Sequence, residues 1–364
     1  MRRTLLHSLT VLFLAAAAQA AEWTLYKVGG RDHVSLENVG EFYSLGTVRR
    51  ANKDFVLSVG NRSLRGAAES VEFYINGLKF NLSYPISEVN GRLVVSRMDL
   101  TKVIEPVLRP SKIQGAEKIN TIVLDAGHGG HDRGTPSPWG CEADYTLDVV
   151  NRTRMLLTQA GFKVVLTRSS DIFVPLGERT RIANKYSHAL FISVHFNSGG
   201  AGTGLETYTL APRGVPSMMA DGPRVSDLEL CQGNANDAEN MALATATHAS
   251  LVVRSRMYDR GIKRARFVVI RDIQIPGVLI EGGFLSNLYD AKLVATPAYR
   301  QQMASCILQA VQNFRRAVGT QGAEVAARTT DGPRVETNGP RMRTNPRQSD
   351  AEPVVVTPTI PATN

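Results

Sequence analysis

Between about residue 119 and residue 318, short apolar runs alternate with longer stretches in which apolar residues recur every three or four positions. The short runs predict buried strands, and the longer stretches predict amphipathic helices. This alternation is typical of an α/β domain, a mostly parallel sheet with helices on both faces. The expected strands are 122–124, 162–167, 189–194, 205–210 and 277–280, and the expected helices are 147–160, 176–186, 238–257 and 297–318.

Residues 21–112 follow a different pattern, in which apolar and polar residues alternate at every second position. Segment 71–75 alternates up to Asn76-Gly77, and the alternation resumes after this pair. An Asn-Gly pair between two such runs is a strong hairpin signal, and a second one occurs at 90–91. Segment 99–108 fits one short helix before a proline. We therefore expect a small β-rich module, in which we find no catalytic cluster.

The two ends of the chain differ from both regions. Residues 1–20 have the pattern of an export signal, with Arg2 and Arg3 before an apolar stretch and Ala18-Gln19-Ala20 as a cleavage site. No stretch approaches the ~20 apolar residues of a transmembrane helix, so we expect a periplasmic or extracellular protein, exported by the Sec or the twin-arginine route. Residues 319–364 lose hydrophobic periodicity and gain Pro and Thr, which predicts a disordered tail.

Composition adds limits on the partners and on the cysteines. The 364 residues are 43% hydrophobic and leave room for about two domains. The formal net charge of +9 favours polyanionic surfaces such as cell-wall polymers, and no nucleic-acid motif accompanies it. Three cysteines are too few for a disulfide scaffold. Cys306 is expected as a buried thiol, and a bridge between Cys141 and Cys231 stays open.

The candidate chemistry begins at the glycine-rich segment 127–134, GHGGHDRG, which follows the first expected strand. A dinucleotide-binding loop would need glycine at position 132, which is Asp, and a P-loop would need a following Lys-Ser or Lys-Thr. Both phosphate-binding interpretations therefore fail. His128 instead stands at the carboxyl end of a strand, where open α/β sheets place their ligands. A lone His in a turn is more often structural, so His128 needs partners.

Three further residues can meet His128 at the same edge of the sheet. His195 and Glu281 end two other strands, and Glu142 begins the first helix. Two imidazoles and one carboxylate can hold a catalytic zinc, and a remaining carboxylate can serve as general base and acid. This set predicts metal-assisted amide hydrolysis. The alternative is that both Glu residues only cap helices or pair with arginines.

Four motifs resemble the zinc-dependent N-acetylmuramoyl-L-alanine amidases of bacterial cell walls: GHGGHDRG at 127–134, Glu142 at a helix start, SVHFNS at 193–198 and IEGGFLSN at 280–287. The resemblance covers residues 119–318. It implies one Zn²⁺ held by His128, Glu142 and His195, with Glu281 as the catalytic residue. The implied substrate is peptidoglycan, cleaved at the amide between the lactyl group of muramic acid and the L-alanine of the stem peptide.

The same resemblance concerns several neighbouring residues. Arg179 and Asn184 match the family's R-x-x-x-A-N pattern, and Arg179, Asn197 and Asp132 are expected to contact substrate or to support the loop. Asp125 and Asp132 should hold the loop through backbone N–H groups. His131 follows the motif glycines; we expect no contact with metal or substrate, and contact at the metal rim is the alternative. Segment 211–236 interrupts the alternation, and we expect a mobile loop at the rim of the site without a full plug.

The N-terminal module loosely resembles the N-terminal-like domain of copper amine oxidases, also found on bacterial wall hydrolases, so a wall-binding or targeting role is expected. We expect a monomer, and an activator protein stays open. Two other functions remain: a different zinc hydrolase acting on the wall, such as a peptidase or deacetylase, and a catalytically dead wall-binding protein. Release of stem peptides with a free L-alanine amine would distinguish the amidase from both.

Overall fold

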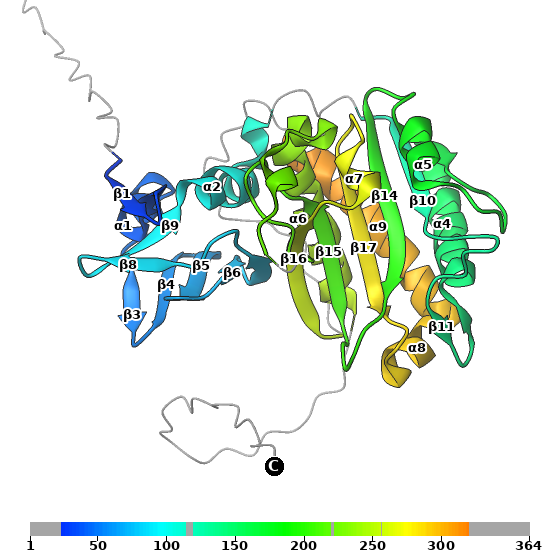
Figure 1. Ribbon diagram of the computed structural model, residues 1–364, viewed down its shortest axis with the longest axis horizontal. Coiled ribbons are helices and arrows are strands. Elements are labelled where there is room, and N and C mark those ends of the chain that lie inside the picture. Colours follow the sequence, from blue (N-terminus) through cyan, green and yellow to red (C-terminus); the bar gives the residue numbers. More distant parts are fainter. Residues whose placement is uncertain (1–22, 114–118, 220–221, 256, 320–364) are drawn as a thin grey trace, which may run out of the picture. The chain divides into compact units, whose positions relative to one another are not determined.

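The computed structural model describes residues 23–113, 119–219, 222–255 and 257–319 (Figure 1). The expected export signal and nearly all of the expected tail lie outside these residues. Within them, the region from residue 119 onward is an α/β structure with a mostly parallel sheet, which confirms the predicted fold class. No helix among these residues is long and apolar enough to cross a membrane.

Six strands of this region lie in the order β13-β10-β14-β17-β15-β16. The first four run parallel to one another, β15 runs antiparallel to β17, and β16 is parallel to β15. We call the edge at which β10, β14 and β17 end the carboxyl edge; β15 and β16 begin there. The strands are β10 (Thr121–Ala126), β13 (Lys163–Leu166), β14 (Ala189–Asn197), β15 (Leu205–Leu210), β16 (Asp259–Ala265) and β17 (Gly277–Phe284).

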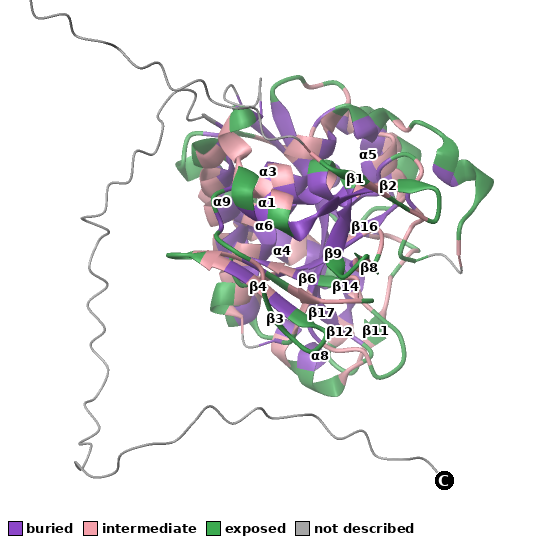
Figure 2. Cartoon of the chain, turned by 90° about the vertical axis from the view of Figure 1, so that its left-hand side faces the viewer, coloured by how far each residue is buried: buried purple, intermediate pink, exposed green. Residues whose placement is uncertain are grey.

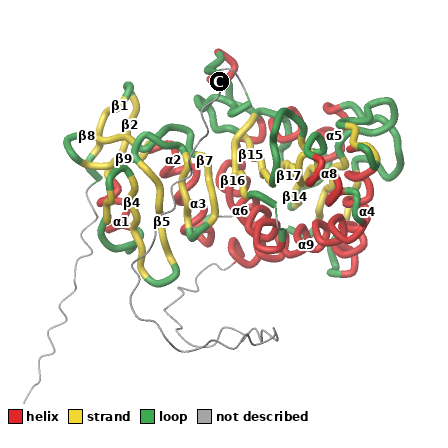
Figure 3. The backbone as a smooth tube through the Cα atoms, turned by 90° about the horizontal axis from the view of Figure 1, so that it is seen from below, coloured by secondary structure: helices red, strands yellow, loops and turns green. Residues whose placement is uncertain are grey.

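Helices cover both faces of these strands because successive strand residues point to opposite sides. On one face, Ile192 and Val194 of β14 belong to a core with residues of α4 (Glu142–Gln159), α6 (Asp237–Arg254) and α9 (Pro297–Gly319). Figure 3 shows α6 and α9 together along one side of the strands. On the other face, Phe191 packs with residues of two short helices, α5 (Leu176–Ala183) and α7 (Val268–Arg271).

The predicted elements of this region are all present, with ends displaced by a few residues. The α-helices and strands that were not predicted are β16, α7 and α8 (Leu288–Val294), besides the two-residue strands β11 (Pro136–Ser137) and β12 (Gly140–Cys141). β16 has the sequence DRGIKRA, in which four of seven residues are charged. By contrast, β14, which lies further inside the same sheet, is buried along most of its length (Figure 2). A strand so rich in charge does not show the apolar run by which buried strands are recognised.

The N-terminal module contains both predicted hairpins. Asn76 and Gly77 take positive φ angles of +51° and +83° and join β6 (Glu72–Ile75) to β7 (Leu78–Asn81). The predicted helix is interrupted by a π-helical turn. The other elements are β1 (Leu25–Val28), β2 (Arg31–Ser35), α1 (Leu36–Phe42), β3 (Arg49–Ala51), β4 (Asp54–Val59), β5 (Arg62–Ala67), β8 (Ser87–Val89), β9 (Arg92–Ser96), α2 (Arg97–Asp99), η1 (Leu100–Ile104), α3 (Glu105–Leu108) and η2 (Pro110–Lys112).

The module joins the α/β region through buried polar contacts. β7 pairs with β16 at Phe80 and Ile262, so that strands of both regions belong to one sheet. Arg264 of β16 donates to a carboxylate oxygen of Asp99 at 3.0 Å, and both side chains are buried. Asn81 donates to the Ile262 carbonyl beside them. We call Asn81, Asp99 and Arg264 the module junction.

Segment 211–236 was expected at the rim of the site, but it begins elsewhere. It follows β15, and because β15 runs antiparallel to β17, the segment leaves the sheet at the edge opposite the carboxyl edge. It contains two short helical turns, η4 (Val225–Leu228) and η5 (Gln232–Asn236). The expectation of a rim loop that starts at the site is therefore wrong. Cys231, in this segment, is a free thiol, as are Cys141 and Cys306.

Candidate metal centre

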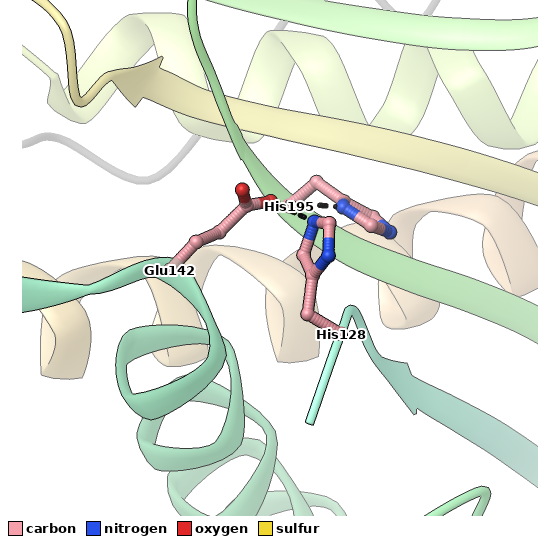
Figure 4. Close-up of side chains that lie close together, drawn as sticks. All are labelled: His128, Glu142 and His195. Carbon is pink, nitrogen blue, oxygen red and sulfur yellow. Dashed lines mark hydrogen bonds and ion pairs between the residues drawn. The ribbon is translucent and has the colours of Figure 1, made fainter. Parts of the chain in front are cut away.

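Three side chains from distant parts of the chain meet at the carboxyl edge (Figure 4). His128 follows β10, Glu142 is the first residue of α4, and His195 lies near the end of β14. Glu142 Oε1 lies 3.0 Å from His128 Nε2 and 2.9 Å from His195 Nδ1. One potential ligand atom of each residue lies within 4.8 Å of the other two. We call these three residues the His-Glu-His site.

Glycines around the site allow this close approach. A Cβ atom on Gly127 would lie 2.3 Å from Cε1 of His195, so any side chain there would displace the imidazole. A Cβ atom on Gly134 would lie 2.7 Å from Oε2 of Glu142, and Gly134 also has a φ of +62°. His128 itself has a φ of +60°, which is uncommon for a residue other than glycine. The surrounding contacts must therefore hold this backbone in place.

Asp132 and Arg179 supply those contacts. Both carboxylate oxygens of Asp132 lie 2.9 Å from His128 Nδ1, which leaves Nε2 facing Glu142. Arg179 is buried on α5 and donates to the His128 carbonyl at 2.7 Å and to Asp125 at 2.8 Å. Asp125 also accepts from the hydroxyls of Thr167 and Ser193. The expectation that Asp125 binds backbone N–H groups is thus wrong, because its partners are side chains.

The other residues considered from the sequence have different roles. Asn197 donates to Glu206 at 3.2 Å, and the Asn184 amide bonds to backbone groups of residues 272 and 274. The ring of His131 stacks on Phe173 with 4.2 Å between centroids and is not part of the His-Glu-His site. His248 is buried and bonded to Thr207 and Asp259, as a structural residue would be.

The charges of the His-Glu-His site favour an anionic Glu142. Burial alone would raise the pKa of Glu142, but the hydrogen bonds and charges of His128 and His195 outweigh burial and lower it. Burial would lower the pKa of His128, and the carboxylates of Glu142 and Asp132 raise it instead. A carboxylate between two imidazoles is therefore available as a ligand.

Glu281 lies beside this site without a partner of its own. It is directly paired with His195 in the register of β17 and β14, so both side chains point to the same face. Its Oε2 is buried and has no hydrogen-bond partner among the described residues. Burial, followed by the charges of Glu142 and Glu206, raises the pKa of Glu281 well above its ordinary value. Burial of this kind favours the protonated form of a carboxyl over the ionised form.

The donor set suits a zinc ion. Two imidazole nitrogens and one carboxylate oxygen are a ligand set of catalytic zinc, which keeps a fourth position for water or substrate. Asp132 beside His128 Nδ1 is the orienting partner that metal-binding histidines commonly have. The nearby orphan oxygen of Glu281 completes the chemistry expected of a metal-dependent hydrolase.

Sequence reasoning missed a second charged cluster at this edge. Glu206 is the direct partner of Glu281 across β15 and β17, and it binds Arg260 and Lys263 of β16. Glu206 and Arg260 stand at strand starts, whereas the residues predicted to converge at this edge follow strand ends. The available signal was a charged residue in the otherwise uncharged strand LETYTL.

Comparison with known proteins agrees with this geometry. A model of the N-acetylmuramoyl-L-alanine amidase family matches residues 122–313. The chain is 28% identical to the N-acetylmuramoyl-L-alanine amidase AmiA of Escherichia coli (strain K12), over 60% of this chain and 84% of that protein. It is 31% identical to the sporulation-specific N-acetylmuramoyl-L-alanine amidase of Bacillus subtilis (strain 168), over 50% and 63% respectively.

Among solved structures, the N-acetylmuramoyl-L-alanine amidase AmiC2 of Nostoc punctiforme is similar to this chain. The match has a TM-score of 0.45 and 29% sequence identity, and it covers 56% of this chain and 99% of that one. The family match spans β10 to α9 and therefore includes every residue of the His-Glu-His site as well as Glu281.

Proposed function

The chain belongs to the N-acetylmuramoyl-L-alanine amidase family and is a hydrolase of that class, and from this premise we propose its substrate bond and the residues that act on it. The bond is the amide between the lactyl group of N-acetylmuramic acid and the L-alanine of the stem peptide in peptidoglycan. The observation that carries the proposal is the orphan carboxylate oxygen of Glu281, in register with His195 of the His-Glu-His site.

We assign one zinc ion to His128, Glu142 and His195. When bound, zinc supplies a Lewis acid that polarises the amide carbonyl and lowers the pKa of water. Asp132 keeps His128 in the orientation that presents Nε2, and Arg179 holds the backbone carbonyl of the same residue. These two residues have positioning roles, since their contacts go to the loop.

Glu281 carries a proton from the attacking water to the leaving nitrogen. Its carboxylate takes a proton from the attacking water as the new C–O bond forms. It then returns this proton to the nitrogen of L-alanine as the C–N bond breaks, which releases a neutral amine and a carboxyl group on the lactyl side. The raised pKa of Glu281 suits a group that must hold the proton between these two events.

The proposal includes the organisation of the chain. Residues 1–20 act as an export signal, and the enzyme works in the periplasm or outside the cell, where the wall is. Residues 119–318 catalyse the reaction, residues 21–112 bind or target the wall, and residues 319–364 form a tail. The family relationship to wall amidases supports this location. The enzyme acts as a monomer, with an activator protein as a further candidate partner.

The test is digestion of purified sacculi by the purified protein, with and without a chelator. We expect soluble stem peptides that begin with a free L-alanine amine, loss of this release in chelator, and recovery when zinc is added back. Mass spectrometry identifies the fragments. Stem peptides cut elsewhere would indicate a peptidase, loss of acetyl groups alone would indicate a deacetylase, and binding without any release would indicate a dead enzyme.

A further inference from the structure

A second cluster of charged side chains lies beside the His-Glu-His site and takes no part in the mechanism above. His195, Glu281 and Glu206 form one row across β14, β17 and β15. Directly paired residues of neighbouring strands point to the same face, and neighbouring strands lie about 4.8 Å apart. Glu206 therefore lies one strand away from Glu281, on the face that carries the site.

Glu206 is buried and fully bonded. Its carboxylate accepts from Lys263 and from the Tyr208 hydroxyl, both at 2.6 Å, as well as from Arg260 and Asn197. Burial would raise the pKa of Glu206, but these donors outweigh burial and lower it. One cation would balance this ionised carboxylate, whereas Arg260 and Lys263 supply two. The cluster therefore carries a surplus positive charge next to Glu281.

Arg260 exposes part of that charge. Its side chain is 31% exposed, compared with 17% for Lys263, and its guanidinium lies 5.0 Å from the ring centre of Phe284 in β17. Nε binds Glu206 and Nη1 reaches the Thr203 carbonyl at 3.5 Å. Nη2 has no hydrogen-bond partner within the described part of the chain. An arginine nitrogen of this kind can still bind a carboxylate.

The opposite flank of the site has the opposite charge. Around the loop of His128, three exposed carboxylates, those of Asp132, Asp144 and Asp171, accompany one exposed guanidinium, that of Arg133, which pairs with Asp144 and Asp171. All four of these side chains are about half exposed. The exposed charges therefore favour the β15–β16 side over the β10 side for an acidic peptide that leaves the reaction centre.

We propose that Arg260, supported by Lys263, binds a free carboxylate of the stem peptide and makes the enzyme prefer acidic stems. This inference rests on the amidase function proposed above. Arg260 stands about one to two strand spacings from Glu281, which is roughly 5–10 Å. At about 3.5 Å per extended residue, the carboxylate belongs to the second or third residue of the peptide. Glu206 holds the guanidinium in place and does not itself touch substrate.

Two synthetic substrates test the proposal with the zinc-loaded protein: an N-acetylmuramoyl-L-alanyl-glutamyl peptide with free carboxylates, and the same compound with these carboxylates amidated. We expect the wild type to show about a tenfold lower KM for the acid, at the lower end of the effect of a hydrogen bond to a charged group. Arg260→Gln should raise the KM for the acid about tenfold and keep the KM for the amidated substrate within twofold of the wild-type value. It should leave kcat and zinc content unchanged.

Arg152→Gln is the matched control. Arg152 also binds a carboxylate, Asp148, and its side chain is 29% exposed, but it lies on α4. Arg152→Gln should leave the KM for both substrates unchanged. The proposal would be overturned if the wild type had the same KM for both substrates. It would also be overturned if Arg260→Gln raised the KM for both substrates by the same factor.

Calorimetry with the released peptides separates this proposal from the proposed function. If the wild type cleaves neither substrate but binds the acidic peptide in a way that Arg260→Gln weakens about tenfold, the amidase function fails and the carboxylate subsite stands. If the wild type cleaves both substrates and Arg260→Gln binds the acidic peptide as tightly as the wild type does, the amidase function stands and the subsite fails.

Discussion

The module junction and the His-Glu-His site both bury charged side chains, but they balance those charges differently. At the junction one carboxylate, Asp99, meets one guanidinium, Arg264, and also accepts from Ser96 and from two backbone N–H groups. At the site, the carboxylates of Glu142 and Glu281 lie beside two imidazoles, and no arginine or lysine of the described residues forms an ion pair with either of them.

This difference shows that burial of charge does not by itself mark a functional site. Nε and Nη1 of Arg264 are buried without hydrogen-bond partners in the described residues, so the junction also has unsatisfied atoms. Those atoms belong to a cation whose charge Asp99 already balances. The orphan oxygen of Glu281 instead lies beside two imidazoles and a carboxylate, a donor set that suits a metal ion. The junction should therefore control stability, and the site should control catalysis.

Glu281→Gln should have the largest effect, on catalysis alone. The amide removes the proton acceptor and keeps the shape of the side chain, so we expect kcat to fall by about 10²–10⁴-fold, as for the loss of a general base. The zinc content should stay at one per chain, and the melting temperature should not fall, since no hydrogen bond of Oε2 is lost. Initial rates on sacculi, metal analysis and thermal unfolding measure the three quantities.

Glu239→Gln provides the control for this variant. Glu239 of α6 is another carboxyl whose pKa burial raises, and it is not part of the carboxyl edge. Its replacement should leave kcat within twofold. If Glu281→Gln retained more than a tenth of the wild-type rate, Glu281 would not be the general base.

Arg264→Met should act on stability and leave catalysis nearly unchanged. Removing one partner of a buried ion pair typically costs 3–5 kcal/mol, and we expect about 3 kcal/mol because Asp99 keeps its other hydrogen bonds. Denaturant unfolding measures this loss, and kcat per folded molecule should stay within twofold.

Arg50→Met is the exposed counterpart of that variant, because Arg50 pairs with Glu88 at the surface of the module. It should cost less than about 1 kcal/mol. If Arg264→Met lowered the free energy of unfolding no more than Arg50→Met does, the module junction would not stabilise the α/β region. The module would then behave as a separate body.

The sequence predicted most elements of the α/β region and the meeting of His128, His195 and Glu281 for one physical reason. Parallel strands end at the same edge, so residues that follow apolar runs converge there. The same rule could not find Glu206, because β15 runs in the reverse direction and brings its start to that edge.

The joining of the two regions could not be predicted, because it depends on pairs of residues about 180 positions apart. Asn81 and Ile262 belong to segments with unrelated patterns, and nothing local in either segment indicates the other. Asp99 and Arg264 each look like an ordinary surface residue, in a short polar helix and a charged strand, until the fold buries both. The two regions therefore seemed independent from their patterns alone.

Asp132→Asn should have the smallest effect and would sharpen the comparison within the site itself. Both oxygens of Asp132 lie 2.9 Å from His128 Nδ1, so the carboxylate orients the ring and increases its basicity as a ligand. Loss of such a partner typically weakens metal binding 10–100-fold, and we expect about tenfold because the Asn carbonyl can still accept one hydrogen bond. Competition with a chromogenic chelator measures the zinc affinity.

Asp171→Asn is the control for this variant. Asp171 binds the same loop at Gly130 and Arg133 but contacts no histidine among the described residues. The zinc affinity of Asp171→Asn should stay within twofold of the wild type. Unchanged zinc affinity in Asp132→Asn, together with a lower rate, would mean that Asp132 acts on the substrate and not on His128.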